Sequence, residues 1–190
     1  MIAAAGSAAR TRRRWIVSAA AAIAAGAAVS HWQGWKERRR QAVLTEDRDA
    51  VDLFFRQTLP DSQGQVFRFE QLRGKPVVIN FWATWCAPCV EEMPELSALA
   101  TELAGDGVRF VGIGVDSQDR IEAFSRRLPV SYPLVVASAT GAFLSARFGN
   151  TAGGLPYTVV VDSAGRIHFR VLGRVQIDSL RKVLKSSDLH

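Results

Sequence analysis

The chain has 190 residues, room for one ordinary domain and an extension, and its 48% hydrophobic and 22% charged residues argue against extensive disorder. Only two cysteines are present, which excludes a small fold held together by several disulfides. The net charge of +6 comes from residues 1–40, which hold eight basic side chains and one acid, so the near-neutral remainder argues against a nucleic-acid-binding surface.

The N-terminus has the pattern of an export signal. A basic cluster at residues 10–14 precedes an uncharged, alanine-rich stretch over residues 15–29, which is the order of the charged and apolar regions in a secretory signal. Extended to Trp35, the stretch contains 21 uncharged residues, about the number that a helix needs to cross a bilayer. We therefore assign residues 1–35 to a signal or anchor segment.

Two fates of this segment stay open. Left uncleaved, residues 15–35 would anchor the chain in the bacterial inner membrane. Cleavage at small residues such as Ala25–Ala27 would instead release a soluble periplasmic protein. The arginines at 12–14 resemble a twin-arginine signal, so the export route stays open too, and a disordered tail on a cytosolic protein is the remaining alternative. In either exported form the cysteines face an oxidising compartment.

The body follows a charged linker or stalk, residues 36–58, and occupies residues 59–187. Strand and helix patterns alternate along it, and the continuous apolar runs at residues 76–82 and 108–115 are typical of strands buried on both faces. This order predicts an α/β fold of three layers, with a mixed central sheet and helices on both faces. The expected strands are residues 65–69, 76–82, 108–115, 133–136, 157–161 and 166–171, and the expected helices are residues 86–103, 117–127, 142–148 and 177–185.

The two cysteines, Cys86 and Cys89, stand at C-x-x-C spacing where a buried strand passes into a helix. The free N–H groups and the positive dipole end of a helix stabilise a thiolate. Cys86 should therefore have a lowered pKa and attack disulfides, while Cys89, one turn later, attacks the mixed disulfide and resolves it. Pro88 stiffens the first turn, where its missing N–H costs least.

Two other uses of the cysteine pair are weaker. A permanent structural disulfide across four residues gains little from cross-linking. A zinc site needs two further ligands, and the histidines available, His31, His168 and His190, are remote in sequence. We therefore expect a redox-active pair with neither a metal nor a cofactor.

The segment FWATWCAPC, residues 81–89, resembles the active-site segment of the thioredoxin superfamily, and the longer string VVINFWATWCAPCVEEMPEL resembles its TlpA/ResA branch of exported redoxin (AhpC/TSA-like) domains. The resemblance covers about residues 59–185. It implies a thioredoxin-like fold with an N-terminal hairpin and a helix–strand insertion at residues 117–140. Its other supports are the segments at residues 61–64, 72–75, 112–116, 154–156 and 161–165.

The resemblance also implies roles for particular residues. Pro156 matches a cis-proline that faces the cysteines and offers backbone groups to an incoming protein, with Leu155 before it tuning specificity. Trp85 and Pro88 are expected to contact the substrate beside the cysteines.

Glu92 matches an acidic residue beneath the cysteines, where a buried carboxyl of raised pKa could exchange protons with Cys89. The alternative is a solvated surface glutamate. Asn80 replaces the buried aspartate of thioredoxin, which shifts the proton-handling role toward Glu92.

The resemblance implies an enzyme, a thiol–disulfide oxidoreductase outside the cytoplasm. It would reduce protein disulfides, such as those of apocytochrome c or of copper-site cysteines, with electrons from a membrane thiol carrier. Three alternatives stay open: a thiol oxidant, a peroxidase, and a module that binds metal or a partner without catalysis. The peroxidase is disfavoured because Thr84 stands only two residues before Cys86, whereas peroxiredoxins carry a Pro-x-x-x-Thr-x-x pattern before their cysteine.

Overall fold

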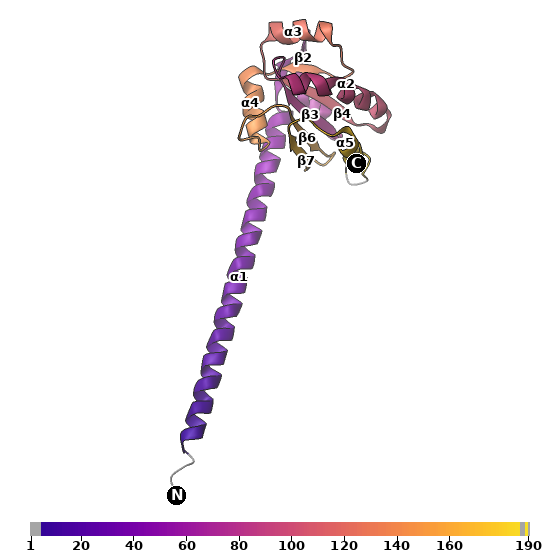
Figure 1. Ribbon diagram of the computed structural model, residues 1–190. Coiled ribbons are helices and arrows are strands. Elements are labelled where there is room, and N and C mark those ends of the chain that lie inside the picture. The colour runs from indigo at the N-terminus through magenta and orange to yellow at the C-terminus, as the bar shows by residue number, and fades with distance from the viewer. Residues whose placement is uncertain (1–4, 187–188, 190) are drawn as a thin grey trace. The chain divides into compact units, whose positions relative to one another are not determined.

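The computed structural model describes residues 5–186 and 189, with side chains from residue 28 onward (Figure 1). The chain divides into two compact units, Met1–Thr45 and Glu46–His190. The described backbone of the first unit is helical throughout and belongs to α1 (Ala5–Phe55).

The predicted signal or anchor segment, residues 1–35, falls largely outside the residues whose side chains are described. Across the described residues, no helix is both long enough and apolar enough to cross a membrane. Trp32 and Trp35 are about half exposed, and Lys36 and Arg39 place their cations over the two indole rings. The assignment of this segment stays a prediction.

The second unit contains the mixed set of strands and helices that the sequence predicts. Its strands are β1 (Thr58–Pro60), β2 (Val66–Arg68), β3 (Val77–Trp82), β4 (Arg109–Gly114), β5 (Leu134–Val136), β6 (Tyr157–Val161) and β7 (Ile167–Leu172). Its helices after α1 are α2 (Ala87–Glu102), α3 (Gln118–Arg127), α4 (Ser138–Arg147) and α5 (Ile177–Leu184), with short 3-10 turns η1 (Phe69–Leu72) and η2 (Ala104–Asp106).

The central sheet has the strand order β5-β4-β3-β6-β7. Strands β3, β4 and β5 run parallel, while β6 pairs antiparallel with both β3 and β7. Strands β1 and β2 form a separate antiparallel hairpin. The predicted α/β class, the mixed sheet and the N-terminal hairpin are therefore confirmed.

Strand β3 divides the interior into two cores. Its residues are all buried, and they alternate between the two faces of the sheet. One face joins the α2-side core, whose members include Val78, Trp82, Cys89, Met93, Leu96, Phe124 and Leu180. The other face joins the aromatic core, whose members include Phe54, Phe67, Phe69, Phe81, Phe148 and Tyr157.

Two differences from the predicted boundaries have physical causes. The compact unit begins at Glu46, because Ala50, Val51, Phe54 and Phe55 at the end of α1 are buried in the aromatic core. The last part of the predicted linker is therefore packed against the domain. The expected strand at residues 65–69 is shorter, because the chain turns into η1 after Arg68.

The helix–strand insertion is present as α3 and β5. Strand β5 pairs with β4 and forms one edge of the central sheet. Helix α3 buries Ile121 and Phe124, and the Phe124 ring lies 4.9 Å from that of Trp82. The insertion therefore extends the sheet and covers part of the α2-side core.

Candidate active site

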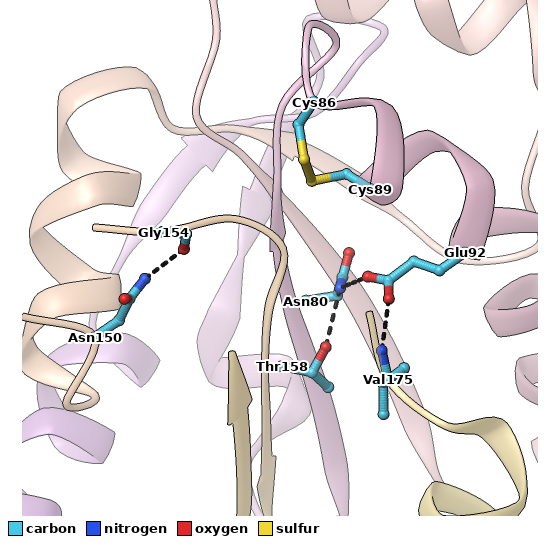
Figure 2. The surroundings of a disulfide bond; sticks show 8 residues. All are labelled: Asn80, Cys86, Cys89, Glu92, Asn150, Gly154, Thr158 and Val175. Atoms are coloured by element: carbon cyan, nitrogen blue, oxygen red, sulfur yellow. Dashed lines mark hydrogen bonds between the residues drawn. A yellow bond between two sulfur atoms is a disulfide. The ribbon is translucent and has the colours of Figure 1, made fainter. Parts of the chain in front are cut away.

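The two cysteines lie where β3 passes into α2, as the sequence predicts. Cys86 is the residue just before the first turn and has extended backbone, and Pro88 occupies that first turn. Cys89 lies within the helix, and its sulfur is bonded to that of Cys86 (Figure 2). This position next to the helix N-terminus favours a thiolate when the pair is reduced.

The surroundings of the two sulfurs differ in accessibility. Cys86 is 5% exposed, whereas Cys89 is completely buried. Trp85, immediately before Cys86, is 65% exposed, and Pro88 is exposed as well. Cys86 is therefore the more accessible of the two cysteines, and Trp85 and Pro88 form exposed surface beside it.

Glu92 lies beneath the disulfide on the buried face of α2, not on the protein surface (Figure 2). Its Oε1 accepts a hydrogen bond of 2.8 Å from Asn80 Nδ2, and its Oε2 accepts one of 2.9 Å from the backbone N–H of Val175. Asn80 Nδ2 also donates to Thr158 Oγ1 at 3.1 Å. The carboxyl is thus held by β3 and by the loop before α5.

Burial raises the pKa of Glu92 above its usual value, because the charged form loses its hydration. The hydrogen bonds from Val175 and Asn80 and the charge of Arg174 act in the opposite direction without cancelling the effect of burial. Arg174 is itself held by Glu95 at 2.7 Å. The site therefore contains a carboxyl that can accept and return a proton near the sulfur of the buried cysteine.

The loop that enters β6 contains a cis peptide bond between Leu155 and Pro156, as the resemblance predicts. Tyr157 pairs with Phe81, which places Pro156 at the end of the sheet where β3 leads into the cysteine loop. Asn150 Nδ2 donates a hydrogen bond of 2.8 Å to the Gly154 carbonyl, and this bond fixes the loop (Figure 2). Pro156 is buried and Leu155 is half-buried.

Sequence reasoning missed a hydrogen bond that holds the loop before Cys86. Thr84 Oγ1 donates to the Asp116 carboxylate, which also accepts from the backbone N–H of Ser117 and faces Arg120 at 3.6 Å. Burial alone would raise the pKa of Asp116, but these hydrogen bonds and the arginine outweigh it and lower the pKa. The strand order could have revealed this contact. Residues that follow two neighbouring parallel strands come together at the same end of the sheet.

The structure therefore brings the predicted residues together at one end of the sheet. Cys86 and Cys89 stand at the helix start, Glu92 lies below them, and Leu155 and Pro156 reach the same end from β6. Within the described residues, no group of three or more His, Cys, Asp or Glu side chains is placed to hold a metal ion. The arrangement suits a dithiol–disulfide cycle.

Comparison with known proteins gives the same assignment. A family model described as AhpC/TSA family matches residues 52–170. The thiol-disulfide oxidoreductase ResA of Geobacillus thermodenitrificans is 31% identical over 129 residues, which cover 67% of this chain and 72% of that protein. ResA of Bacillus anthracis is 29% identical over 126 residues, or 66% of this chain and 70% of that protein.

Solved structures agree with the sequence relatives. The structure of MTB dsbF in its mixed oxidized and reduced forms has a TM-score of 0.59 and 29% identity, covering 68% of this chain and 93% of that chain. A secreted Mycobacterium tuberculosis disulfide oxidoreductase homologous to E. coli DsbE has a TM-score of 0.59 and 25% identity, covering 70% and 97%. The chain therefore belongs to the AhpC/TSA family and is a thiol–disulfide oxidoreductase of thioredoxin fold, similar to the ResA proteins.

Proposed function

We propose that this oxidoreductase reduces disulfides of exported proteins through a cycle of Cys86 and Cys89. The observation that supports this most directly is the asymmetry of the pair: a slightly exposed Cys86 at a helix start, and a fully buried Cys89 above a buried carboxyl. Such an asymmetry separates an attacking thiolate from a resolving thiol.

In the first step the Cys86 thiolate attacks one sulfur of the substrate disulfide. A bond forms between Cys86 Sγ and that sulfur, and the second substrate sulfur leaves as a thiolate that takes a proton from solvent. In the second step Cys89 attacks Cys86 Sγ, which releases the first substrate sulfur as a thiolate and forms the Cys86–Cys89 disulfide. The substrate gains two electrons and the cysteine pair loses two.

Glu92 is the proton acceptor in the second step. Cys89 has to lose its thiol proton before it attacks, and its complete burial keeps bulk water from taking that proton. The raised pKa of Glu92 brings its proton affinity closer to that of a thiol. When the disulfide is reduced again, the same carboxyl returns the proton to Cys89.

The groups around Cys86 contact the substrate. Trp85 and Pro88 are exposed on one side of it, and Leu155 precedes the cis-proline at the same end of the sheet. Apolar, partly exposed side chains of this kind suit contact with an unfolded or partly unfolded protein segment that contains a disulfide.

The proposed location is the periplasmic side of the inner membrane. The export pattern of residues 1–35 supports it, and one of the similar structures is described as secreted. We propose a domain order of signal or anchor at residues 1–35, linker at residues 36–58, and thioredoxin-like domain at residues 59–187, with the last part of the linker packed against the domain. The resemblance to the TlpA/ResA branch favours apocytochrome c or copper-site cysteines as substrates and a membrane thiol carrier as the electron donor.

Trapping tests the roles of the cysteines. Cys89→Ser should accumulate a mixed disulfide between Cys86 and substrate proteins, because the resolving thiol is gone. Cys86→Ser should abolish exchange and trap nothing. Mass spectrometry of the adducts identifies the linked cysteine, and an adduct through Cys89 in the Cys86→Ser chain would reverse the assignment.

Location is tested with the full chain fused at its C-terminus to a reporter that folds only outside the cytoplasm. Reporter activity is expected with the native N-terminus and should be lost when residues 10–14 and 15–29 are replaced by a polar sequence. Equal activity of both fusions would remove the export role of this segment.

A further inference from the structure

Tyr132 is a buried polar residue that the redox cycle described above does not use. It lies in the segment between α3 and β5, within the insertion, and is 6% exposed. Its ring packs against Phe110, with ring centroids 6.1 Å apart. Among the residues that the structure describes, no side chain or backbone group forms a hydrogen bond with its hydroxyl. A buried hydroxyl without a partner is uncommon and calls for an explanation.

Packing places the Tyr132 ring against β4, the strand that pairs with the one carrying Asn80. Gly112 of β4 is the register partner of Asn80. A Cβ atom added at Gly112 would lie 3.3 Å from Tyr132 Cε2 and 3.1 Å from Trp82 Nε1. The glycine therefore lets the tyrosine and tryptophan rings close over β4 beside Asn80.

The hydroxyl also lies within electrostatic reach of the carboxyl below the disulfide. Burial raises the pKa of Tyr132, and the charge of Glu92 raises it further. The phenol therefore stays protonated and remains a hydrogen-bond donor at every pH at which the enzyme would work.

A matching acceptor is present in the same network. Asn80 Oδ1 is buried and has no hydrogen-bond partner among the described residues, whereas Asn80 Nδ2 donates to Glu92 and Thr158. The Tyr132 O–H and the Asn80 carbonyl are a donor and an acceptor that both lack partners, and Trp82 Nε1, close to the same glycine, is a second buried donor without one among the described residues. A rotation of a side chain, or a bridging water, is required to pair the Tyr132 hydroxyl with Asn80 Oδ1.

We propose that Tyr132 is a positioning residue, whose hydroxyl donates to the Asn80–Glu92 network and holds the Asn80 amide with its N–H toward Glu92. The proposal rests on the proton-accepting role of Glu92 proposed above. If the amide turned over, Asn80 Oδ1 would face Glu92 and favour the protonated carboxyl. Tyr132 thus keeps Glu92 ready to accept the proton of Cys89, and it gives the insertion a role in the chemistry.

Arg174 and Glu95 also act on the charge of Glu92. Arg174, from the loop before α5, favours the ionised carboxyl, while Glu95 on α2 disfavours it. Arg174 also pairs with Glu91, and both partners lie on the exposed side of α2. None of these groups changes when Tyr132 is replaced, so a Tyr132 variant isolates the hydroxyl.

The two tyrosines of the chain form a matched pair for the test. Tyr157 lies in the aromatic core, on the opposite face of the sheet. Its hydroxyl donates a hydrogen bond of 2.9 Å to the Phe148 carbonyl. Tyr132→Phe and Tyr157→Phe each remove one hydroxyl and keep the ring. The full chain is used for both variants, and the pKa of Glu92 is followed by the titration of its side-chain carboxyl carbon in NMR spectra.

Tyr132→Phe is expected to raise the pKa of Glu92 by about one unit, because the ionised carboxyl loses support from a fixed donor network. The acid limb of the pH profile for thiol–disulfide exchange should move upward by the same amount. Tyr157→Phe should leave the pKa of Glu92 and the pH profile unchanged while lowering the midpoint of urea unfolding, since it leaves the Phe148 carbonyl without its donor.

The titration separates this proposal from the proposed function. An unchanged pKa of Glu92 in Tyr132→Phe would overturn the role of Tyr132. A raised pKa with an unchanged exchange profile would uphold Tyr132 as a positioning residue and remove Glu92 from the proton transfer. Equal shifts in both tyrosine variants would also overturn the proposal, because they would reveal a general effect of loosened packing.

Discussion

The two faces of β3 support cores of different character. On one face, Phe81 joins the aromatic core, where edge-to-face contacts link Phe54 to Phe55, Phe69 and Phe148. On the other face, Asn80 and Glu92 place an amide and a carboxyl among apolar side chains. The same strand thus packs a purely stabilising interface on one side and a polar network beneath the cysteines on the other.

The residues that stabilise the fold and those that the proposed chemistry uses therefore lie on different faces of one sheet. Aromatic packing contributes stability through buried area and ring contacts. A buried carboxyl instead reduces stability when it is charged, and in the proposed cycle it accepts the proton of Cys89. Substitutions in the aromatic core should therefore change unfolding, and substitutions in the polar network should change pH dependence.

Phe54→Ala should have the largest effect on stability. The side chain is fully buried and contacts three other rings, so its removal should cost about 3–5 kcal/mol. Urea unfolding measures the loss. The pH at half-maximal exchange should stay at the wild-type value under conditions where the variant is folded, and a shifted profile would show that the two cores are coupled.

Asn80→Asp should shift the acid limb of exchange further than any other variant that keeps Glu92. It replaces an amide 2.8 Å from Glu92 with a second carboxyl, and two carboxyls that share a buried site cannot both ionise easily. The acid limb of exchange should move upward by about one pH unit or more. A profile identical to wild type would mean that Asn80 does not govern the protonation of Glu92.

Glu92→Gln should alter both exchange and the pH dependence of stability. Because burial raises the pKa of Glu92, the folded chain binds this proton more tightly than the unfolded chain does. The resulting stabilisation is complete below the ordinary value of 4.5 and is lost as the pH rises through the higher pKa of the folded state. Glu92→Gln should lack this loss, and it should also lack the acid limb of exchange.

Glu91→Gln is the matched control for this variant. Glu91 is the neighbouring residue on α2, but it is exposed and pairs with Arg174 at 3.6 Å. Its removal should leave the unfolding free energy and its pH dependence nearly unchanged. Identical behaviour of the two variants would contradict the role of Glu92 in proton transfer.

Apart from the Glu91 control, Thr158→Val should have the smallest effect. Thr158 is fully buried on β6 and accepts one hydrogen bond from Asn80. The nearly isosteric change removes that acceptor and should cost about 1 kcal/mol in urea unfolding. A loss as large as that of Phe54→Ala would mean that the polar network contributes to stability as strongly as the aromatic core.

Local patterns in the sequence were sufficient to predict the central part of this fold. The apolar run at residues 76–82 predicts a buried strand, and the C-x-x-C spacing after it predicts the helix start with its cysteine pair. The cis bond before Pro156 and the position of Glu92 beneath the cysteines came from the family resemblance instead. A glutamate on a helix is exposed by default, so periodicity alone favours the wrong environment for Glu92.

Contacts between distant segments could not be predicted in the same way. The N–H of Val175 reaches Glu92 across 83 positions of sequence, and Tyr132 packs on β4 at the register partner of Asn80 only because that partner is Gly112. The end of α1 shows the same limit. Its apolar residues predict a short helix, but nothing local indicates that Phe54 packs against Phe69 and Phe148.

The reduction potential of the full chain tests the proposed direction of electron flow most directly. It is measured by trapping free thiols after equilibration across a series of dithiothreitol or glutathione ratios, with Cys89→Ser as the control that cannot form the disulfide. A reductant of protein disulfides should have a potential near or below the ~−270 mV of thioredoxin. A value near the ~−120 mV of a strong disulfide donor would contradict the account and make the protein an oxidant.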